Sequence, residues 1–307
     1  MTAVAALDQL QSRRCPVCGS SAEEAVIEAN VEASRLGPLA FASRKPPELM
    51  HHRLVGCPVC DTLYASPAPT PAALEAAYAA AAYDSAESAR FAARTYAGFL
   101  PRVLARTPAG GGGLDIGAGD GAFLRELMAS GVHPAIGVEP SPAAVATAAP
   151  DIRVHIRQAV FRPEHFDVGG FRLVTALQTL EHVADPLAVC RGARDLLRDG
   201  GALLVVCHNR RAPANRAMGR RSPIFDVQHL QLFSPRSLRA LLDRAGLADV
   251  ELLPVPNRYP LRAWLRLAPV PAPLKRRLLR VLRGRVGGVP LRLPAGNLAA
   301  IGYRRAR

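Results

Sequence analysis

The chain has 307 residues, of which 49% are hydrophobic and 21% charged, with a formal net charge of +14. This is the balance of a folded globular protein with room for one large and one smaller domain, and it excludes a collagen-like or wholly disordered chain. No stretch approaches the ~18 consecutive apolar residues of a membrane span, and the first residues contain an acid and only a short apolar run, unlike a secretory signal. We therefore expect a cytoplasmic protein.

Two C-P-V-C segments lie near the start of the chain. In a cytosolic protein, two C-x2-C pairs are typical of a tetrahedral zinc site, because each pair points two sulfurs at one ion. The 38 residues between the pairs exceed the usual ~15–20, so the loop between them must hold its own element. We expect a structural Zn2+ in a zinc-ribbon-like module over residues 1–66; the alternative is four buried thiols without metal. The expected ligands are Cys15, Cys18, Cys57 and Cys60.

A helical connector is expected over residues 67–108. A Pro-rich break leads to Thr70, which suits a helix N-cap, and to Pro71, which suits the first helical position. An Ala/Leu/Glu-rich stretch of one or two helices follows, and the run AGGGG ends it. Residues 109–307 then form the main domain.

A strand, a glycine turn and a helix follow the connector. The strand ends at Asp115, the turn has alternating glycines at 117, 119 and 121, and the next strand, AIGVE, ends at Glu139. The spacing G-x-G-x-G, with an acid two residues before it, differs from the G-x-G-x-x-G of dinucleotide binders. S-adenosylmethionine (SAM) carries no phosphate but has an ammonium and a sulfonium, for which Asp115 is a suitable neighbour. The alternative is a tight turn that binds no ligand.

At these residues the sequence resembles the class I SAM-dependent methyltransferases. GGFRLVTALQTLEHVADPLAVCRGARDLLRDGGALLVVCHN looks like the family's fourth strand, turn, helix and fifth strand, and NLAAIGYR looks like its last strand. The resemblance covers residues 109–253 and 295–307. It extends to a subset with an N-terminal CxxC…CxxC region and a Y-x-x-P-x-P connector, here Tyr64, Pro67 and Pro69.

The resemblance implies an α/β fold: a Rossmann-like seven-stranded methyltransferase sheet, with the zinc-ribbon-like module before it and a basic helical insertion at 254–294. It also implies cofactor contacts. The three glycines would pass close to the methionine part of SAM, Asp115 would bind its amino group, and Glu139 would bind the ribose hydroxyls. Gln158 stands where the family often has an acid that meets the adenine. The early tyrosines Tyr83 and Tyr78 would close over the cofactor or pack in the core. The three glycines that would pass close to SAM are Gly117, Gly119 and Gly121.

Methyl transfer needs a positioned nucleophile and, for some acceptors, a base. His182 follows the fourth strand, where strand ends open onto a cleft, and is the first candidate base. The alternative is that Glu181 and His182 only hold the turn through hydrogen bonds. His229 is a second candidate, with packing or loop capping as its alternative. Cys190 and Cys207 sit in apolar runs and are expected in the core.

The positive charge is concentrated at the C-terminal end. Residues 252–307 contain no acid, which leaves +1 for everything before them; their 13 basic residues are Arg258, Arg262, Arg266, Lys275, Arg276, Arg277, Arg280, Arg283, Arg285, Arg292, Arg304, Arg305 and Arg307. Within 254–294, leucines alternate with arginines at helical spacing around Trp264. Three interpretations stay open: leucines packed on the core, an interfacial helix on anionic lipid or over a lipid-linked substrate, and contact with RNA phosphates.

The sequence thus predicts a methyltransferase that moves a methyl group from SAM to an O, N or C atom of a small-molecule acceptor of lipid or sugar type. The alternatives are a zinc-ribbon RNA (rRNA) methyltransferase and a membrane-associated, non-catalytic relative. Nucleic acid is disfavoured as a partner because residues 15–60 hold five acids against four bases. The turn after the fourth strand also lacks the N/D-P-P-Y and P-C sequences of base-modifying enzymes. Peripheral contact with a membrane surface through 254–294 is compatible with a cytoplasmic location.

Overall fold

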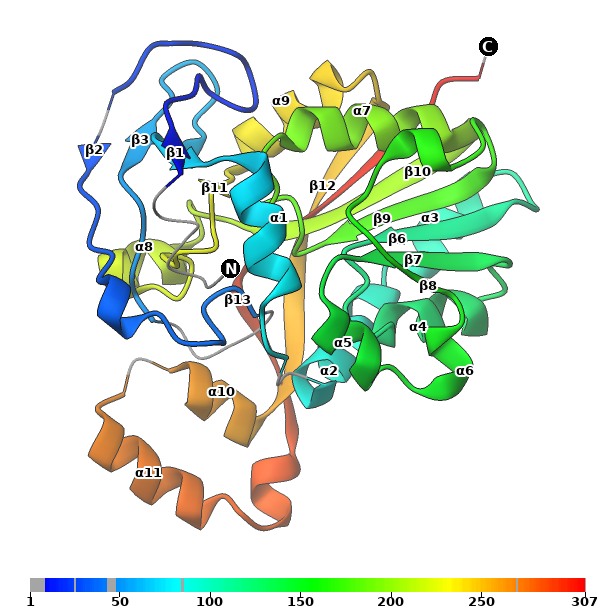
Figure 1. The fold of residues 1–307 in the computed structure, drawn as a ribbon. Coiled ribbons are helices and arrows are strands. Elements are labelled where there is room, and N and C mark those ends of the chain that lie inside the picture. Colours follow the sequence, from blue (N-terminus) through cyan, green and yellow to red (C-terminus); the bar gives the residue numbers. More distant parts are fainter. Residues whose placement is uncertain (1–8, 25, 43–47, 84–85, 269, 307) are drawn as a thin grey trace.

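The computed structural model describes residues 9–24, 26–42, 48–83, 86–268 and 270–306 (Figure 1). Residues 1–8 and 43–47 of the expected N-terminal module, and residue 307, therefore lie outside the described residues. No helix in the described part of the chain combines the length and the apolar character needed to cross a bilayer.

A seven-stranded sheet forms the centre of the molecule, in the order β12-β13-β10-β9-β6-β7-β8. Strands β8, β7, β6, β9 and β10 are parallel, and β13 runs antiparallel to both β10 and β12. The chain order reverses between β6 and β9, and such a reversal opens a crevice at the carboxyl ends of the strands. The strands are β6 (Gly112–Ile116), β7 (Ala135–Glu139), β8 (Ile156–Gln158), β9 (Phe171–Leu177), β10 (Leu197–His208), β12 (Ala248–Pro260) and β13 (Pro290–Tyr303).

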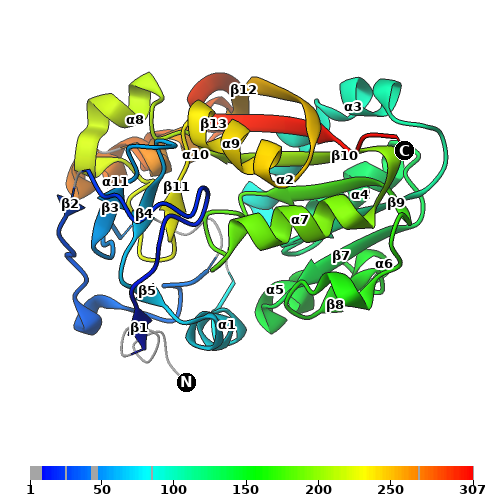
Figure 2. The same cartoon turned by 90° about the horizontal axis from the view of Figure 1, so that it is seen from above.

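Helices cover both faces of this sheet (Figure 2). Side chains of β10 alternate between two apolar clusters: Leu203 and Val205 face one, Leu204 and Val206 the other. The first cluster is completed by α7 (Pro186–Leu196) and α9 (Pro235–Arg244). The second is completed by α2 (Ala86–Ala97), α3 (Leu100–Arg106), α4 (Ala122–Ala129), α5 (Pro142–Thr147) and α6 (Pro150–Arg153). Short elements also connect the strands: η3 (Pro163–His165), α8 (Pro213–Met218) and η4 (Gly219–Arg221).

Two expectations about the core are confirmed. Cys190 and Cys207 are fully buried in the first cluster. The coarse α/β architecture, with a mostly parallel central sheet, is also confirmed. The run that contains Cys207 is continuously apolar, as a parallel strand covered on both faces requires, whereas Cys190 lies on the buried side of α7.

The connector contains three helices, one more than the upper expectation. The first, α1 (Pro71–Ala79), begins as predicted: the Thr70 side chain accepts a hydrogen bond from the Ala73 amide, and Pro71 is the first helical residue. The following stretch then breaks between α2 and α3. Because Pro101 in the first turn of α3 lacks an amide hydrogen, it cannot continue the preceding helix and instead starts a new one.

The N-terminal module shares a sheet with the main domain. Its strands β2 (Val26–Ile27), β3 (Leu54–Gly56) and β4 (Leu63–Ala65) are joined by β11 (Gln231–Leu232), which comes from the far end of the chain. A second small sheet pairs β1 (Leu10–Gln11) with β5 (Ala68–Pro69), and η2 (Ala33–Arg35) lies between β2 and β3. The module therefore gains from β11 a strand that its own short sequence does not supply.

Arg13 ties this module to two loops of the main domain. Its guanidinium donates to the carbonyl oxygens of Ala65, Ala184 and Leu230 and to the Gln231 side chain. Burial lowers the pKa of Arg13 to about 10, so the side chain stays charged at neutral pH. Charge-assisted donors of this kind are stronger than neutral ones.

The last hairpin reaches further than expected into the 254–294 segment. Strands β12 and β13 stay paired as far as Pro260 and Pro290, because Asn257 and Tyr259 turn buried side chains toward the body. Helices therefore occupy only residues 261–289, which we call the basic arm. It contains α10 (Leu261–Leu267), α11 (Ala272–Val281) and η5 (Arg285–Gly288), and it projects from the end of the hairpin (Figure 1).

Candidate active site and cysteine cluster

Acidic residues mark the carboxyl ends of two neighbouring strands. Asp115 lies on β6 with 2% of its surface exposed, and the Thr175 hydroxyl on β9 donates to its Oδ1 at 2.6 Å. Glu139 ends β7, and its register partner on β8 is Gln158, whose side chain is exposed. The structure thus brings Asp115, Glu139 and Gln158 to one edge of the sheet.

The glycine turn between β6 and α4 has two glycines that packing requires and one that it does not. A Cβ at Gly117 would lie 2.5 Å from the Thr179 hydroxyl, and a Cβ at Gly121 would lie 2.3 Å from Ile152. At Gly119 the nearest atom is the Tyr83 hydroxyl, 3.8 Å away. All three glycines have positive φ. The absence of a side chain at 119 therefore leaves open space over the turn.

Glu139 holds the turn in place. Its Oε2 accepts a hydrogen bond from the Gly119 amide and its Oε1 from the Ser141 amide, both at 2.8 Å. Burial raises the pKa of Glu139, although these two amides favour the ionised form.

These residues fit SAM. A buried acid on β6 suits the ammonium group, and an acid at the end of β7 suits a pair of hydroxyls, because carboxylates accept charge-assisted hydrogen bonds. The open space at Gly119 gives a ligand access to the turn, with Tyr83 beside it. None of these contacts requires a phosphate group on the ligand, which SAM lacks and a dinucleotide has.

Three histidine rings form a row on the neighbouring loops. The centre of the His229 ring lies 4.9 Å from that of His182 and 5.0 Å from that of His208. His182 follows β9, His208 ends β10, and His229 precedes β11. We call these three residues the histidine cluster.

Each ring meets an oxygen acceptor through Nδ1. The partners are the Gln228 carbonyl at 3.2 Å for His182, the Ile224 carbonyl at 2.8 Å for His229 and the Asn297 Oδ1 at 2.9 Å for His208. Because these oxygens can only accept, the hydrogen of each neutral ring belongs on Nδ1. In this tautomer the lone pair of each ring lies on Nε2.

Tyr78 on α1 connects the histidine cluster to the cofactor side. Its ring meets that of His182 edge-on, with the centres 6.1 Å apart. Burial raises the pKa of Tyr78 well above its usual value, and the nearby carboxylates of Asp226, Glu139 and Glu181 raise it further. The phenol therefore remains protonated at neutral pH.

Sequence reasoning missed His208. The residue directly follows a buried apolar run, and a polar side chain at the end of a parallel strand is a usable signal. Its partner Asn297 could not have been found in this way, because their contact depends on the antiparallel register of β10 and β13.

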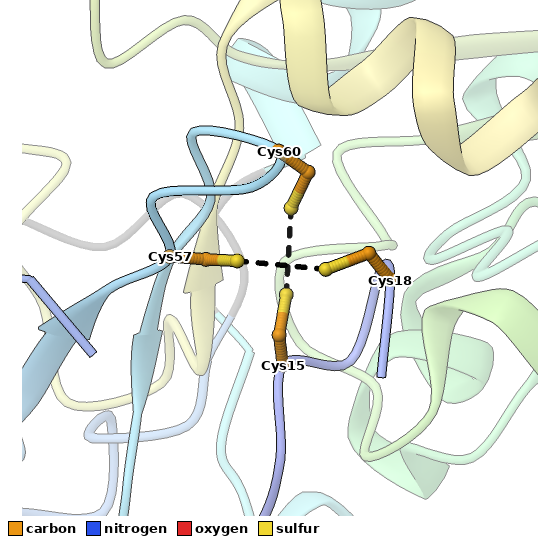
Figure 3. Close-up of side chains that lie close together, drawn as sticks. All are labelled: Cys15, Cys18, Cys57 and Cys60. Atoms are coloured by element: carbon orange, nitrogen blue, oxygen red, sulfur yellow. Dashed lines mark hydrogen bonds between the residues drawn. The ribbon is translucent and has the colours of Figure 1, made fainter. Parts of the chain in front are cut away.

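The four cysteines of the two C-x2-C pairs come together, as Figure 3 shows. Their sulfur atoms all lie within 4.8 Å of one another; Cys15 and Cys60 are 3.4 Å apart and Cys18 and Cys57 are 3.5 Å apart. A tetrahedral ZnS4 site with Zn–S bonds of about 2.3 Å needs sulfurs about 3.8 Å apart. The arrangement fits one zinc ion.

Both cysteine pairs have the same local fold. The amide of the residue directly after each second cysteine donates back to the first cysteine of the pair: Gly19 to the Cys15 carbonyl and Asp61 to the Cys57 carbonyl. Both donors have positive φ. The neighbouring thiol of Cys15 and burial raise the pKa of Cys60, so without a cation its thiol keeps its proton. Zinc would replace such protons, since thiolates are its ligands.

A family model described as a methyltransferase domain matches residues 88–252, more than half of the chain. The chain therefore belongs to the methyltransferase-domain family. This confirms the resemblance inferred from the sequence at the level of the family.

Curated proteins are also similar to this chain in sequence. The chain is 33% identical over 162 residues to a ubiquinone biosynthesis O-methyltransferase of Xanthomonas axonopodis, a match covering 48% of this chain and 67% of the relative. It is 32% identical over 112 residues to the protein of the same name from Marinobacter nauticus, covering 33% of this chain and 46% of that relative. The chain thus spans about half of the Marinobacter relative and two thirds of the Xanthomonas one.

Solved structures of low identity are also similar. A SAM-dependent methyltransferase of Thermotoga maritima matches with a TM-score of 0.46 and 18% identity, covering 72% of this chain and 93% of that one. A geranyl diphosphate C-methyltransferase of Streptomyces coelicolor matches with a TM-score of 0.44 and 17% identity, covering 69% and 78%.

Proposed function

We propose that this protein is a SAM-dependent methyltransferase acting on a small-molecule acceptor, with the histidine cluster supplying the base. The observation that carries this proposal is the row of three rings with Nδ1 tied to oxygen acceptors, beside an acid-bearing glycine turn. When bound, SAM supplies a methyl group activated by its sulfonium.

The cofactor would be held by residues that the fold already positions. Asp115 binds the amino group, Glu139 the ribose hydroxyls, and Gly117, Gly119 and Gly121 let the backbone approach the methionine part. Gln158, on the strand next to that of Glu139, accepts a hydrogen bond from the adenine amino group through its amide oxygen. Tyr83 closes over the ligand beside Gly119. Each role is supported by the geometry of the turn and the strand ends.

His229 acts as the base that removes the acceptor proton. Its Nδ1 makes the shortest ring contact of the three, to the Ile224 carbonyl, which orients Nε2 and stabilises the imidazolium that forms. His182 and His208, on either side, orient the acceptor. The protonated phenol of Tyr78 can donate a hydrogen bond to the acceptor.

The acceptor is a small molecule whose reacting O, N or C atom loses a proton on methylation. The names of the curated relatives favour an oxygen acceptor. A base is most useful for a hydroxyl or an acidic carbon, since an amine attacks through its own lone pair. A lipid- or sugar-type acceptor fits this chemistry.

The four cysteines, in this proposal, hold a structural zinc within residues 1–66, followed by the connector (67–108) and the catalytic domain (109–307). Four thiolates leave no open coordination position, so the metal takes no part in the transfer. The location is cytoplasmic, with peripheral membrane contact through the C-terminal insertion as argued below.

Transfer of labelled methyl from SAM into fractionated extract of the source cells tests the proposal. We expect label in the small-molecule or lipid fraction, and a loss of about 10²–10⁴-fold for His229→Gln, with SAM affinity unchanged in titration calorimetry. The matched control is His155→Gln, whose side chain is exposed elsewhere. RNase-sensitive label, or full turnover by His229→Gln, would contradict the proposal.

A further inference from the structure

The basic arm and the start of β13 expose an unusual number of aliphatic side chains. Among the described residues, 13 large hydrophobic side chains are exposed, and seven of these lie between residues 274 and 293. We call the seven the aliphatic face: Leu274, Leu278, Val281, Val286, Val289, Leu291 and Leu293. So many exposed aliphatic side chains within residues 274–293 are unfavourable in water and indicate an interaction surface.

The aliphatic face follows the helical repeat along α11. Leu274, Leu278 and Val281 are spaced i, i+4, i+7, so they share one side of the helix, and 75% of the Val281 surface is exposed. Leu279 and Leu282, on another side, are half-buried, and α11 packs against α10. The outer side is therefore not the side that holds the arm together.

Unpaired positive charge lies on the same segment as this face. Residues 261–289 contain eight basic residues and no acid. Arg276, Arg277, Arg280 and Arg283 are exposed, and none of them forms an ion pair with another described residue. In contrast, Arg262 near the hairpin pairs with Glu87.

Trp264 is engaged with the hairpin rather than with this surface. Its Nε1 donates to the Leu291 carbonyl at 3.1 Å, and its ring packs edge-on against Tyr259. The tryptophan holds the arm to the hairpin, so the outward contacts are aliphatic and basic only.

We propose that the aliphatic face and its arginines dock on an anionic lipid surface. A bilayer offers anionic headgroups for guanidinium groups and an apolar layer for leucine and valine, so it satisfies both halves of the surface. A nucleic acid would satisfy only the arginines and would leave the aliphatic face in water. A symmetric second copy would bring two fully basic arms together. The proposal does not rest on the proposed methyl transfer.

Sedimentation with lipid vesicles tests this docking. The full-length protein is mixed with vesicles of phosphatidylcholine alone or of an equimolar mixture of phosphatidylcholine and phosphatidylglycerol. We expect binding to the anionic vesicles only, weakened by added salt. Burial of each aliphatic side chain favours binding. The triple variant Leu274→Gln/Leu278→Gln/Val281→Gln should therefore bind the anionic vesicles at least about tenfold more weakly.

Matched variants separate the arm from the rest of the surface. Val154→Gln/Val168→Gln removes aliphatic side chains of similar exposure elsewhere and should bind normally. Arg276→Gln/Arg277→Gln should lose binding, whereas Arg191→Gln/Arg244→Gln, on α7 and α9, should not. Unchanged SAM affinity and unfolding temperature show that each variant is folded.

Three outcomes would overturn the proposal. One is no binding to either vesicle. Another is binding that the arginine variant loses but the aliphatic triple variant keeps, since this indicates a polyanion site without insertion. The third is a dimer in light scattering that the triple variant dissociates, because the aliphatic face would then belong to a second copy. Docking does not require turnover, so a failure here leaves the methyl-transfer proposal to its own test.

Discussion

Glu181 is the acid most affected by its surroundings in the candidate site. Its side chain is fully buried; Oε1 accepts a hydrogen bond from the His208 amide, and Oε2 has no hydrogen-bond partner among the described residues. Burial raises its pKa from the ordinary 4.5 to about 8. The folded protein therefore binds a proton here that the unfolded chain releases near pH 4.5.

This proton makes stability fall as pH rises. Between pH 4.5 and about 8 the folded state holds more protons at this group than the unfolded state, so the free energy of unfolding decreases with pH. The slope is at most about 1.4 kcal/mol per pH unit for one proton. We predict that Glu181→Gln removes this contribution, and urea unfolding from pH 5 to pH 9 measures it. Parallel slopes in both proteins would contradict the assignment.

Some individual residues of the candidate active site could be proposed from the sequence. Asp115, Glu139, His182 and His229 could be proposed because each follows an apolar run or lies in a motif with known chemistry. The meeting of His182 with His229 could not, because 47 positions separate them and only the loop before β11 brings the rings together. The Nδ1 partners of the three rings, two backbone carbonyls and the Asn297 side chain, likewise come from the fold and not from a local pattern.

The glycine turn separates structural from ligand-binding requirements within one element. Gly121→Ala would place a methyl group 2.3 Å from Ile152 at a positive φ, so we predict a loss of at least about 2 kcal/mol of stability. Gly119→Ala meets no atom closer than 3.8 Å and should cost only about 1 kcal/mol of backbone strain. Urea unfolding of both variants compares the two costs.

For SAM affinity, in contrast to stability, Gly119→Ala should be the more damaging of the two substitutions. In calorimetric titrations with SAM, Gly119→Ala should bind at least about tenfold more weakly, because its methyl group enters the open space over the turn. Gly131→Ala is the control, since it also has positive φ and open surroundings but lies after α4. Equal SAM affinity in Gly119→Ala and Gly131→Ala would show that the turn does not face the cofactor.

Elements with strong local signals were predictable. The cap at Thr70 and the buried side of α4, with Phe123, Leu124 and Leu127, follow from capping and helical periodicity. The break between α2 and α3 and the extension of β12 to Pro260 were not predicted. The first depends on one proline, and the second on pairing with β13, which lies 30 residues further along the chain.

The N-terminal module and the main domain are joined in this structure, because β4 pairs with β11 and the Arg13 side chain donates hydrogen bonds to the Ala184 and Leu230 carbonyls. We predict one zinc ion per chain, released on denaturation and measured with a colorimetric chelator. Its removal should destabilise the whole protein by about 4 kcal/mol, or about 6 °C in the unfolding midpoint. Cys57→Ser should behave like the metal-free protein and Cys190→Ser should retain zinc.

A single unfolding transition is part of this prediction. If the module were independent, metal removal would leave a later transition at the unchanged temperature of the main domain, and that result would contradict the coupling. The cysteine spacing predicted that the four cysteines meet, but not the pairing of β4 with β11, because β11 has only two residues and carries no strand signal of its own.

Because Pro260 pairs with Pro290, the basic arm is an insertion that can be removed or replaced as one segment. Its two ends meet across the hairpin, so residues 261–289 can be exchanged for a short turn without separating the strands that carry them. Deleting them would yield a compact protein that keeps the glycine turn, the histidine cluster and the cysteines. If the proposed docking holds, grafting the same segment onto the tip of another antiparallel hairpin would give an unrelated protein the ability to bind anionic lipid surfaces.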